Sequence, residues 1–111
     1  MLMGISGQAK VFVCKEAVDM RKSFEGLSAI VESIFDASPT SGAYFVFLNR
    51  LHDRMKVLYW DSDGLAIWYK RLEKGRFSRG NNENIMMDRR EFFMLLEGIT
   101  PHRLQRRYKL Y

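Results

Sequence analysis

The spacing of apolar residues changes along the chain and predicts its first elements. Residues 10–16 (KVFVCKE) are rich in β-branched residues, which favours a strand. Apolar residues then recur at steps of four, three, four and three: Met20, Phe24, Leu27, Val31 and Ile34. This spacing is typical of one face of an amphipathic helix. We therefore predict a long helix over residues 19–36, with Asp19 as its N-cap.

The middle of the chain predicts an antiparallel meander. Short polar links separate three β-rich runs, at 43–49, 55–60 and 65–72. The link DSDG fits a type I turn in which Gly64 takes the left-handed position as a bulge residue. That turn would set Trp60 opposite Ala66 and Leu58 opposite Trp68.

Both faces of this predicted hairpin are apolar, whereas an antiparallel sheet with one solvated face alternates apolar and polar residues. One face should take the long helix. The other face needs a second cover, for which the candidates are the C-terminal helix, another copy of the protein or a ligand.

The C-terminal part adds a short strand and a second helix. The run IMM at 85–87 is the candidate strand, and Asp88 followed by Glu91 predicts a capping box, with Met87 placed to pack against Phe92. We predict a single α+β domain over residues 1–99. It consists of an antiparallel β meander with a long amphipathic helix packed on one face and a short C-terminal helix. A basic tail follows at 100–111.

Positive charge is concentrated in the second half of the chain. The net charge is +5, and residues 61–111 hold eleven Lys and Arg against seven acids, a balance of +4. The densest cluster follows the meander: Lys70, Arg71, Lys74, Arg76 and Arg79. A basic surface favours a polyanionic partner such as nucleic acid, although a solvated loop explains the cluster equally well.

Two further features have a functional and a structural interpretation each. At the predicted helix start, free backbone N–H groups together with Arg21 and Lys22 would suit a phosphate. Alternatively, Asp19 only caps the helix and Arg21 pairs with a carboxylate elsewhere. Trp60 and Trp68 would stack on nucleic-acid bases or, as is usual in a small β domain, pack in the core.

No catalytic, metal-binding or cofactor-binding pattern is found in the sequence. Asp61 and Asp63 lack the glycine and glutamate spacing of an EF-hand loop, and His52 and His102 have no neighbouring ligands. The single cysteine, Cys14, is typical of a buried side chain in a reducing compartment. With neither a signal peptide nor a membrane span in the pattern, we expect a soluble, cytoplasmic, non-enzymatic protein without cofactors.

Three stretches carry a resemblance to a known family: DMRKSFEGL, SGAYFVFLNRLHDRMKVLYWDSDGLAIWYKRLEKGRF and LLEGI. The most specific part is KVLYWDSDGLAIWYKRLEKGRF. They resemble the TnpB accessory proteins of the bacterial insertion-sequence-sixty-six transposable elements, which are encoded beside a separate transposase. The resemblance spans approximately residues 10–99 and departs at Ser23, where the family often has glycine. It implies an accessory role in moving the element, with element-end DNA and the transposase as partners.

These features together predict a non-catalytic accessory factor for DNA transposition that binds nucleic acid through a basic surface. The candidate contact residues are Arg21, Lys22, Lys70, Arg71, Lys74, Arg76 and Arg79. The alternative is a protein-interaction module that docks on the transposase, or self-associates as a homodimer, through the spare sheet face without contacting DNA.

Overall fold

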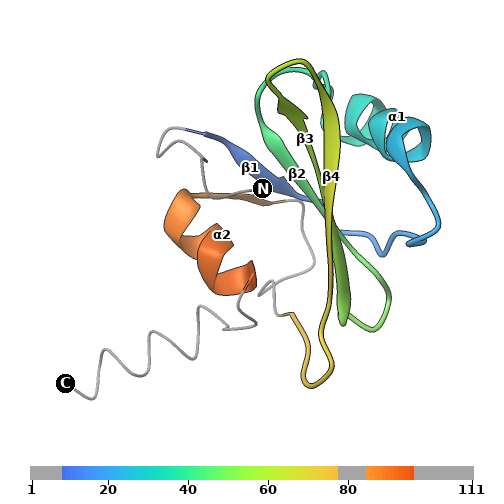
Figure 1. Cartoon of the computed structure of the whole chain (residues 1–111), viewed down its shortest axis with the longest axis vertical. Helices are drawn as coiled ribbons and strands as arrows, with labels where there is room; N and C mark the ends of the chain where they lie inside the picture. The colour runs from blue at the N-terminus through green and yellow to red at the C-terminus, as the bar shows by residue number, and fades with distance from the viewer. Residues whose placement is uncertain (1–8, 78–84, 97–111) are drawn as a thin grey trace.

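A five-stranded sheet forms the centre of the structure, with one helix on each side (Figure 1). The computed structural model describes residues 9–77 and 85–96. Its elements are β1 (Val11–Val13), α1 (Phe24–Ile34), β2 (Tyr44–Leu48), β3 (Arg54–Asp61), β4 (Gly64–Arg71), β5 (Ile85–Met87) and α2 (Arg89–Leu96). The predicted α+β class, the three consecutive strands of the meander and the short C-terminal helix are confirmed. The predicted tail at 100–111 lies outside the described residues.

The sheet is mixed, which corrects the prediction of a purely antiparallel meander. The strand order is β4-β3-β2-β1-β5. Strands β2, β3 and β4 are antiparallel neighbours, whereas β1 runs parallel to β2 and antiparallel to β5. The connection between β1 and β2 explains why these two strands are parallel. Helix α1 carries the chain back from the end of β1 to the start of β2, so both strands enter the sheet in the same direction.

The first helix is shorter than predicted and begins later. It has 11 residues, starting at Phe24, in place of the predicted 19–36. Asp19 does not cap it, because its carboxylate accepts the backbone N–H of Arg21 in a separate turn. Ser23 occupies the position before the helix, with an extended backbone (φ −120°, ψ −148°) and no side-chain capping hydrogen bond.

Only the middle of the predicted apolar stripe is buried. Leu27 and Val31 have no exposed surface, whereas Phe24 and Ile34, at the two ends of α1, are 44% and 42% exposed. Met20 precedes the helix and packs against the same core from the chain leading into it. The helix therefore contacts the sheet through its central turns, and its first turn leaves part of that sheet face uncovered.

The β3–β4 hairpin is paired one residue away from the predicted register. Leu58 lies opposite Ile67 and not opposite Trp68. The turn contains two residues, and the first of them, Ser62, has the positive φ, of 57°, while Gly64 belongs to the strand. A shift of one residue changes which side chains of the two strands share a face. The predicted grouping of the two faces is therefore wrong, although the alternation within each strand is right.

Both faces of the central strands are covered, and the second cover is the C-terminal helix. Buried side chains on the α1 face include Leu27, Val31, Phe45, Phe47 and Leu58. Buried side chains on the α2 face include Val46, Met55, Val57, Phe92 and Leu95. Trp68 is half-buried against the α2-side core, whereas Trp60, near the hairpin turn, is 38% exposed. The expected core role of the tryptophans thus holds for Trp68 more than for Trp60.

Helix α2 begins with the predicted capping box. The carboxylate of Asp88 accepts the backbone N–H of Glu91 at 2.8 Å, and the carboxylate of Glu91 accepts the backbone N–H of Asp88 at 3.4 Å. Met87 and Phe92 flank this box and lie in the same buried cluster. Over the described part of the chain, neither helix has the length and apolar character needed to cross a membrane.

Truncation of Phe92 tests whether α2 is an integral cover of the sheet. Phe92 has no exposed surface, and replacing a buried phenylalanine by alanine costs about 3–5 kcal/mol. We expect Phe92→Ala to lower the free energy of unfolding by about this amount in urea denaturation. The control Met86→Ala, at a β5 residue that is 63% exposed, should change it by less than about 0.5 kcal/mol. Equal, small effects of the two substitutions would contradict the packing of α2.

Candidate nucleic-acid interface

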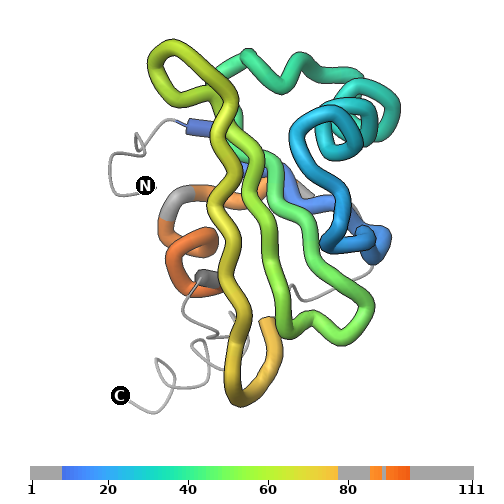
Figure 2. Tube along the Cα trace, turned by 45° about the vertical axis from the view of Figure 1, so that its right-hand side comes forward, coloured from blue at the N-terminus to red at the C-terminus, as the bar shows by residue number. Residues whose placement is uncertain are grey.

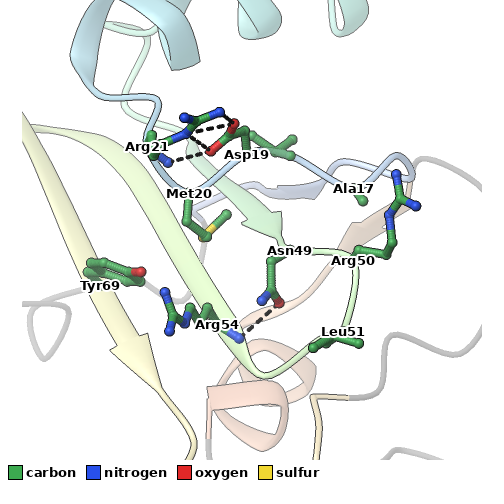
Figure 3. Close-up of a pocket in the computed structure, with 10 residues that line it drawn as sticks. Ala17, Asp19, Met20, Arg21, Asn49, Arg50, Leu51, Arg54 and Tyr69 are labelled. Atoms are coloured by element: carbon green, nitrogen blue, oxygen red, sulfur yellow. Dashed lines mark hydrogen bonds and ion pairs between the residues drawn. The ribbon is translucent and has the colours of Figure 1, made fainter.

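An open groove lies on the α1 face of the sheet, beside the chain that leads into the helix (Figure 3). Figure 2 shows this chain on the same side of the sheet as α1. Its volume is about 720 Å³. Residues 17–21 form one wall and the β2–β3 loop, 49–54, forms the other, with Tyr69 of β4 at one end. A smaller hollow lined by Arg54, Tyr69, Arg71 and Glu73 adjoins it. Because the two hollows share Arg54 and Tyr69, we treat them as one surface, the arginine groove.

The first wall is a segment that runs along β2, with a bend at residues 15–16. The N–H of Cys14 donates to the carbonyl of Val46 at 3.0 Å, and the N–H of Val18 donates to the carbonyl of Leu48 at 2.9 Å. The side chains of Cys14 and Val18 are buried. The segment therefore stays hydrogen-bonded to β2 beyond the end of β1, which keeps these residues out of the helix and explains why α1 starts later than the apolar spacing predicts.

Asp19 and Arg21 form a tight turn at the rim of the first wall (Figure 3). The Arg21 guanidinium donates three hydrogen bonds to the Asp19 carboxylate, at 2.6, 3.0 and 3.1 Å. These side-chain bonds, together with the backbone N–H of Arg21, lower the pKa of Asp19 to about 2. Arg21 thus has a carboxylate partner, which is Asp19 itself and not a distant acid. Its side chain is nevertheless 91% exposed.

Asn49 organises the second wall. Its side-chain oxygen accepts the backbone N–H groups of Asp53 and Arg54, both at 3.0 Å, and its side-chain nitrogen donates to the Asp53 carboxylate at 2.6 Å. One side chain thereby replaces several backbone hydrogen bonds that the loop cannot form. The loop presents Arg50 and Leu51 to solvent from this fixed backbone.

Tyr69 stands at one end of the groove, against a buried lysine. Lys56 lies opposite Tyr69 in the sheet, and its ammonium group is 5.0 Å from the centre of the tyrosine ring. The same ammonium group donates a hydrogen bond to the carbonyl of Lys22 at 2.8 Å. Lys56 is 9% exposed and Tyr69 is 48% exposed. One cation therefore connects the ring to the segment leading into α1.

Four arginines from three segments of the chain line the groove: Arg21, Arg50, Arg54 and Arg71. Two of them have acidic partners, Arg21 with Asp19 and Arg71 with Glu73 at 3.0 Å. Among residues 9–77 and 85–96, the guanidinium groups of Arg50 and Arg54 have no hydrogen-bond or ion-pair partner. Four cations against the two acids that line it make the groove electropositive.

Two of the seven predicted contact residues meet in this groove. Arg21 and Arg71 line it from the first wall and from the end of β4. Lys70 does not belong to it, because Lys70 pairs with Met55, whose side chain lies in the core on the α2 face. Neighbouring residues of a strand point to opposite faces, so the run of cations after the meander is divided between the two sides of the sheet.

The remaining predicted residues lie around the groove or beyond the described chain. Lys22 is exposed, and its stem packs against Gly26, where a Cβ would come within 3.2 Å of it. Lys74 and Arg76 are exposed in the turn that follows β4. Arg79 lies outside the described residues. Contact of any of these side chains with nucleic acid stays a prediction.

Arg50, Arg54 and Tyr69 line the groove but were not among the predicted contact residues. The link NRLHDR at 49–54 did carry a signal, since it brings two arginines into a short connection between strands. Grouping Arg54 with Tyr69 requires the correct hairpin register, which pairs Arg54 with Arg71 two residues further along β4. The incorrect register placed them on opposite faces.

Metal chemistry receives no support from the described residues, among which no three His, Cys, Asp or Glu side chains gather closely enough to hold an ion. Asp61 and Asp63 flank the turn residue Ser62, in keeping with the turn role that the sequence predicts. Cys14 is buried, as predicted.

Replacing Asn49 by alanine should loosen the second wall. The substitution removes the acceptor of two backbone N–H groups, and leaving the partly buried one, of Asp53, unsatisfied costs about 1–3 kcal/mol. We expect the thermal midpoint to fall by about 4–8 °C for each kcal/mol lost in a domain of this size. The control Ser33→Ala, at an exposed hydroxyl 3.4 Å from the Ile30 carbonyl, should leave the midpoint nearly unchanged. An unchanged midpoint for Asn49→Ala would mean that the loop holds its form without this side chain.

The Asp19–Arg21 pair makes a specific prediction about pH. Because the folded pKa of Asp19 lies below its ordinary value of 3.8, the pair stabilises the turn fully above that value and is lost as the pH falls toward about 2. An NMR titration of the Asp19 carboxyl carbon should therefore show a midpoint of about 2. In Arg21→Ala the midpoint should return toward 3.8. A wild-type midpoint that Arg21→Ala does not move would rule out the pair in solution.

The chain was compared with known protein families and with known proteins. The model of the family described as IS66 Orf2 like protein matches residues 9–106. Uncharacterized protein y4jC of Sinorhizobium fredii (strain NBRC 101917 / NGR234) is 32% identical over 108 residues, which cover 96% of this chain and 92% of the relative. Uncharacterized protein y4hO of the same organism is 33% identical over 97 residues, covering 85% and 84%. No solved structure matches the chain. The resemblance noted in the sequence is thus confirmed, and the chain belongs to the IS66 Orf2-like family, whose role is accessory to transposition.

Proposed function

We propose that this protein is a non-catalytic accessory factor for DNA transposition that binds DNA through the arginine groove. Family membership supports the transposition context. The observation that carries the DNA contact is the gathering of four arginines from three segments of the chain around one open groove. The transposase of the element is the expected protein partner.

The chemistry of these side chains favours phosphate as the ligand. A guanidinium group presents a planar set of N–H donors that matches two phosphate oxygens at once. Arg50 and Arg54 supply this group without an acidic partner among the described residues, and Arg21 remains 91% exposed despite its bond to Asp19. Contacts of this kind fix a protein on the nucleic-acid backbone with little dependence on sequence.

Further cations can extend the contact beyond the groove. Lys74 and Arg76 are exposed in the turn just after Arg71, and Lys22 is exposed beside Arg21. Arg79, which follows the same turn in sequence, is kept in the proposal as an expectation from its charge. Lys70 is left out, because its strand position assigns it to the opposite face of the sheet.

The alternative of a module that docks on the transposase or on a second copy drew its support from a spare apolar sheet face. Helix α2 covers that face, with Phe92 and Leu95 buried against it. Two of the exposed apolar side chains, Leu51 and Tyr69, belong to the arginine groove. The geometry therefore favours the DNA-binding proposal over this alternative.

The test is a binding titration on labelled element-end DNA, prepared both as a duplex and as separated strands, from low to physiological salt. Each phosphate contact contributes about 0.9 to the slope of log K against log salt on duplex DNA and about 0.7 on a single strand. We expect Arg54→Ala to weaken binding and to reduce the slope by about one contact. The matched control is Lys10→Ala, which removes one exposed charge next to the opposite end of β2 and should change neither quantity.

Transposition in cells links this binding to function. Arg54→Ala should reduce transposition while co-purification with the transposase persists, because only the DNA contact is weakened. Equal effects of Arg54→Ala and Lys10→Ala, or a binding constant that ignores salt, would contradict the proposed groove. Full transposition by Arg54→Ala with DNA binding lost would favour the protein-interaction alternative.

A further inference from the structure

We infer that the arginine groove takes single-stranded DNA, with one base stacked on Tyr69 and the flanking phosphates bound by arginines. This inference rests on the proposed function and deepens it, because it names the form of DNA that the groove fits. It depends on three features of the described residues. They are the exposure of Tyr69, the way Lys56 holds the ring, and the size of the groove.

Tyr69 is the most exposed of the aromatic side chains that the described strands place on the α1 face of the sheet, ahead of Trp60, which is 38% exposed. Phe45 and Phe47 of β2 are fully buried there, whereas Tyr69 is 48% exposed. It lies where the cover provided by α1 ends, at the mouth of the groove (Figure 3). An exposed aromatic ring on a sheet, bordered by cations, is the kind of platform on which proteins stack unpaired bases.

Lys56 fixes the ring in place from the protein side. Its ammonium group contacts the tyrosine ring at 5.0 Å and is anchored at 2.8 Å on the carbonyl of Lys22. Since Lys56 is 9% exposed, its ammonium group interacts with the protein and is not accessible to a phosphate of a bound nucleic acid. A ring held in advance loses little conformational freedom when a base stacks on its exposed surface, which favours binding.

The arginines border the ring on the side where a nucleic-acid backbone would run. Arg54 and Arg71 are direct cross-strand partners, and both line the hollow that contains Tyr69. Figure 3 shows the Arg54 side chain between Tyr69 and the loop that carries Asn49 and Leu51. Leu51 is 58% exposed and offers apolar surface farther along the groove. Along the groove, the ring of Tyr69 is therefore followed by the guanidinium group of Arg54 and then by the apolar side chain of Leu51.

The size of the groove selects a single strand over a duplex. A hollow of about 720 Å³ has the volume of a site for a drug-sized molecule, comparable with one or two nucleotides. A double helix keeps its base faces stacked on one another, so it has none to offer to Tyr69 and could contact the groove only through its phosphates. Only an unpaired strand can use the ring and the arginines together.

The experiment measures fluorescence anisotropy of three labelled probes with the full chain. They are a short thymidine oligonucleotide, an abasic strand of the same length, and a duplex of that length. We expect the thymidine strand to bind about ten-fold or more tightly than the abasic strand, because the abasic strand keeps its phosphates but cannot stack. Tyr69→Ala should remove that difference, whereas Tyr69→Phe, which keeps the ring, should preserve it.

Two controls separate stacking from charge and from folding. Trp60→Ala removes an exposed aromatic residue elsewhere on the sheet and should preserve the preference for thymidine. Arg54→Ala should weaken binding of the thymidine and abasic strands by the same factor. The comparison of probes on the wild-type protein needs no variant, so it stands even if Tyr69→Ala fails to fold.

The outcomes distinguish this inference from the function on which it rests. Equal, salt-dependent affinity for all three probes would overturn base stacking and leave DNA binding by the groove intact. A preference for the duplex would do the same. Absence of binding to every probe would overturn both. A thymidine preference that survives Tyr69→Ala would also overturn the inference, since the stacking surface would then lie elsewhere.

Discussion

The structure depends on burying both apolar faces of the central strands. Side chains of β2 and β3 point alternately into two cores. Phe45 and Leu58 pack on the α1 side of the sheet, and Val46 and Val57 pack on the α2 side. The connection from β1 to β2 supplies the first cover. Pairing of β5 with β1 brings the second cover to the opposite side of the sheet. Neither helix is long, and helices of this length gain most of their stability from such packing.

The arginine groove is a consequence of where the first cover ends. The chain after β1 stays hydrogen-bonded to β2 through Val18, so α1 begins only at Phe24 and leaves one end of the sheet face bare. The strand residues on this face there are Arg54, Lys56, Tyr69 and Arg71. Lys56 lies beneath the segment leading into α1 and bonds to its backbone, which joins the exposed end of the sheet to the first wall. Fold stability and the form of the groove therefore rest on the same contacts.

Family membership and geometry contribute different kinds of information about function. The family associates the chain with transposition, and its two curated relatives are themselves uncharacterized. The groove indicates the kind of ligand, because its arginines suit an anion. These cations come from segments that only folding brings together. Asp19 and Glu73 each pair with one arginine, which reduces the local charge and fixes the orientation of the guanidinium groups. Arg50 and Arg54 are left to provide the attraction for an anion.

Local patterns in the sequence were sufficient for the strands, the capping box of α2 and the need for two covers, because alternation and capping are properties of neighbouring residues. They placed Arg21 and Arg71 among the candidate contacts from charge alone. They failed for the length of α1, the parallel pairing of β1 and the register of the β3–β4 hairpin. The first two depend on partners distant in sequence, because β2 holds Cys14 and Val18 by backbone hydrogen bonds and the crossover sets the strand direction. The third depends on the turn at Ser62, which sets the pairing of β3 with β4 as far as Arg54 and Arg71. The same long-range pairing brings Arg54 beside Tyr69 and sends Lys70 to the other face, so the groove itself exists only in the folded chain.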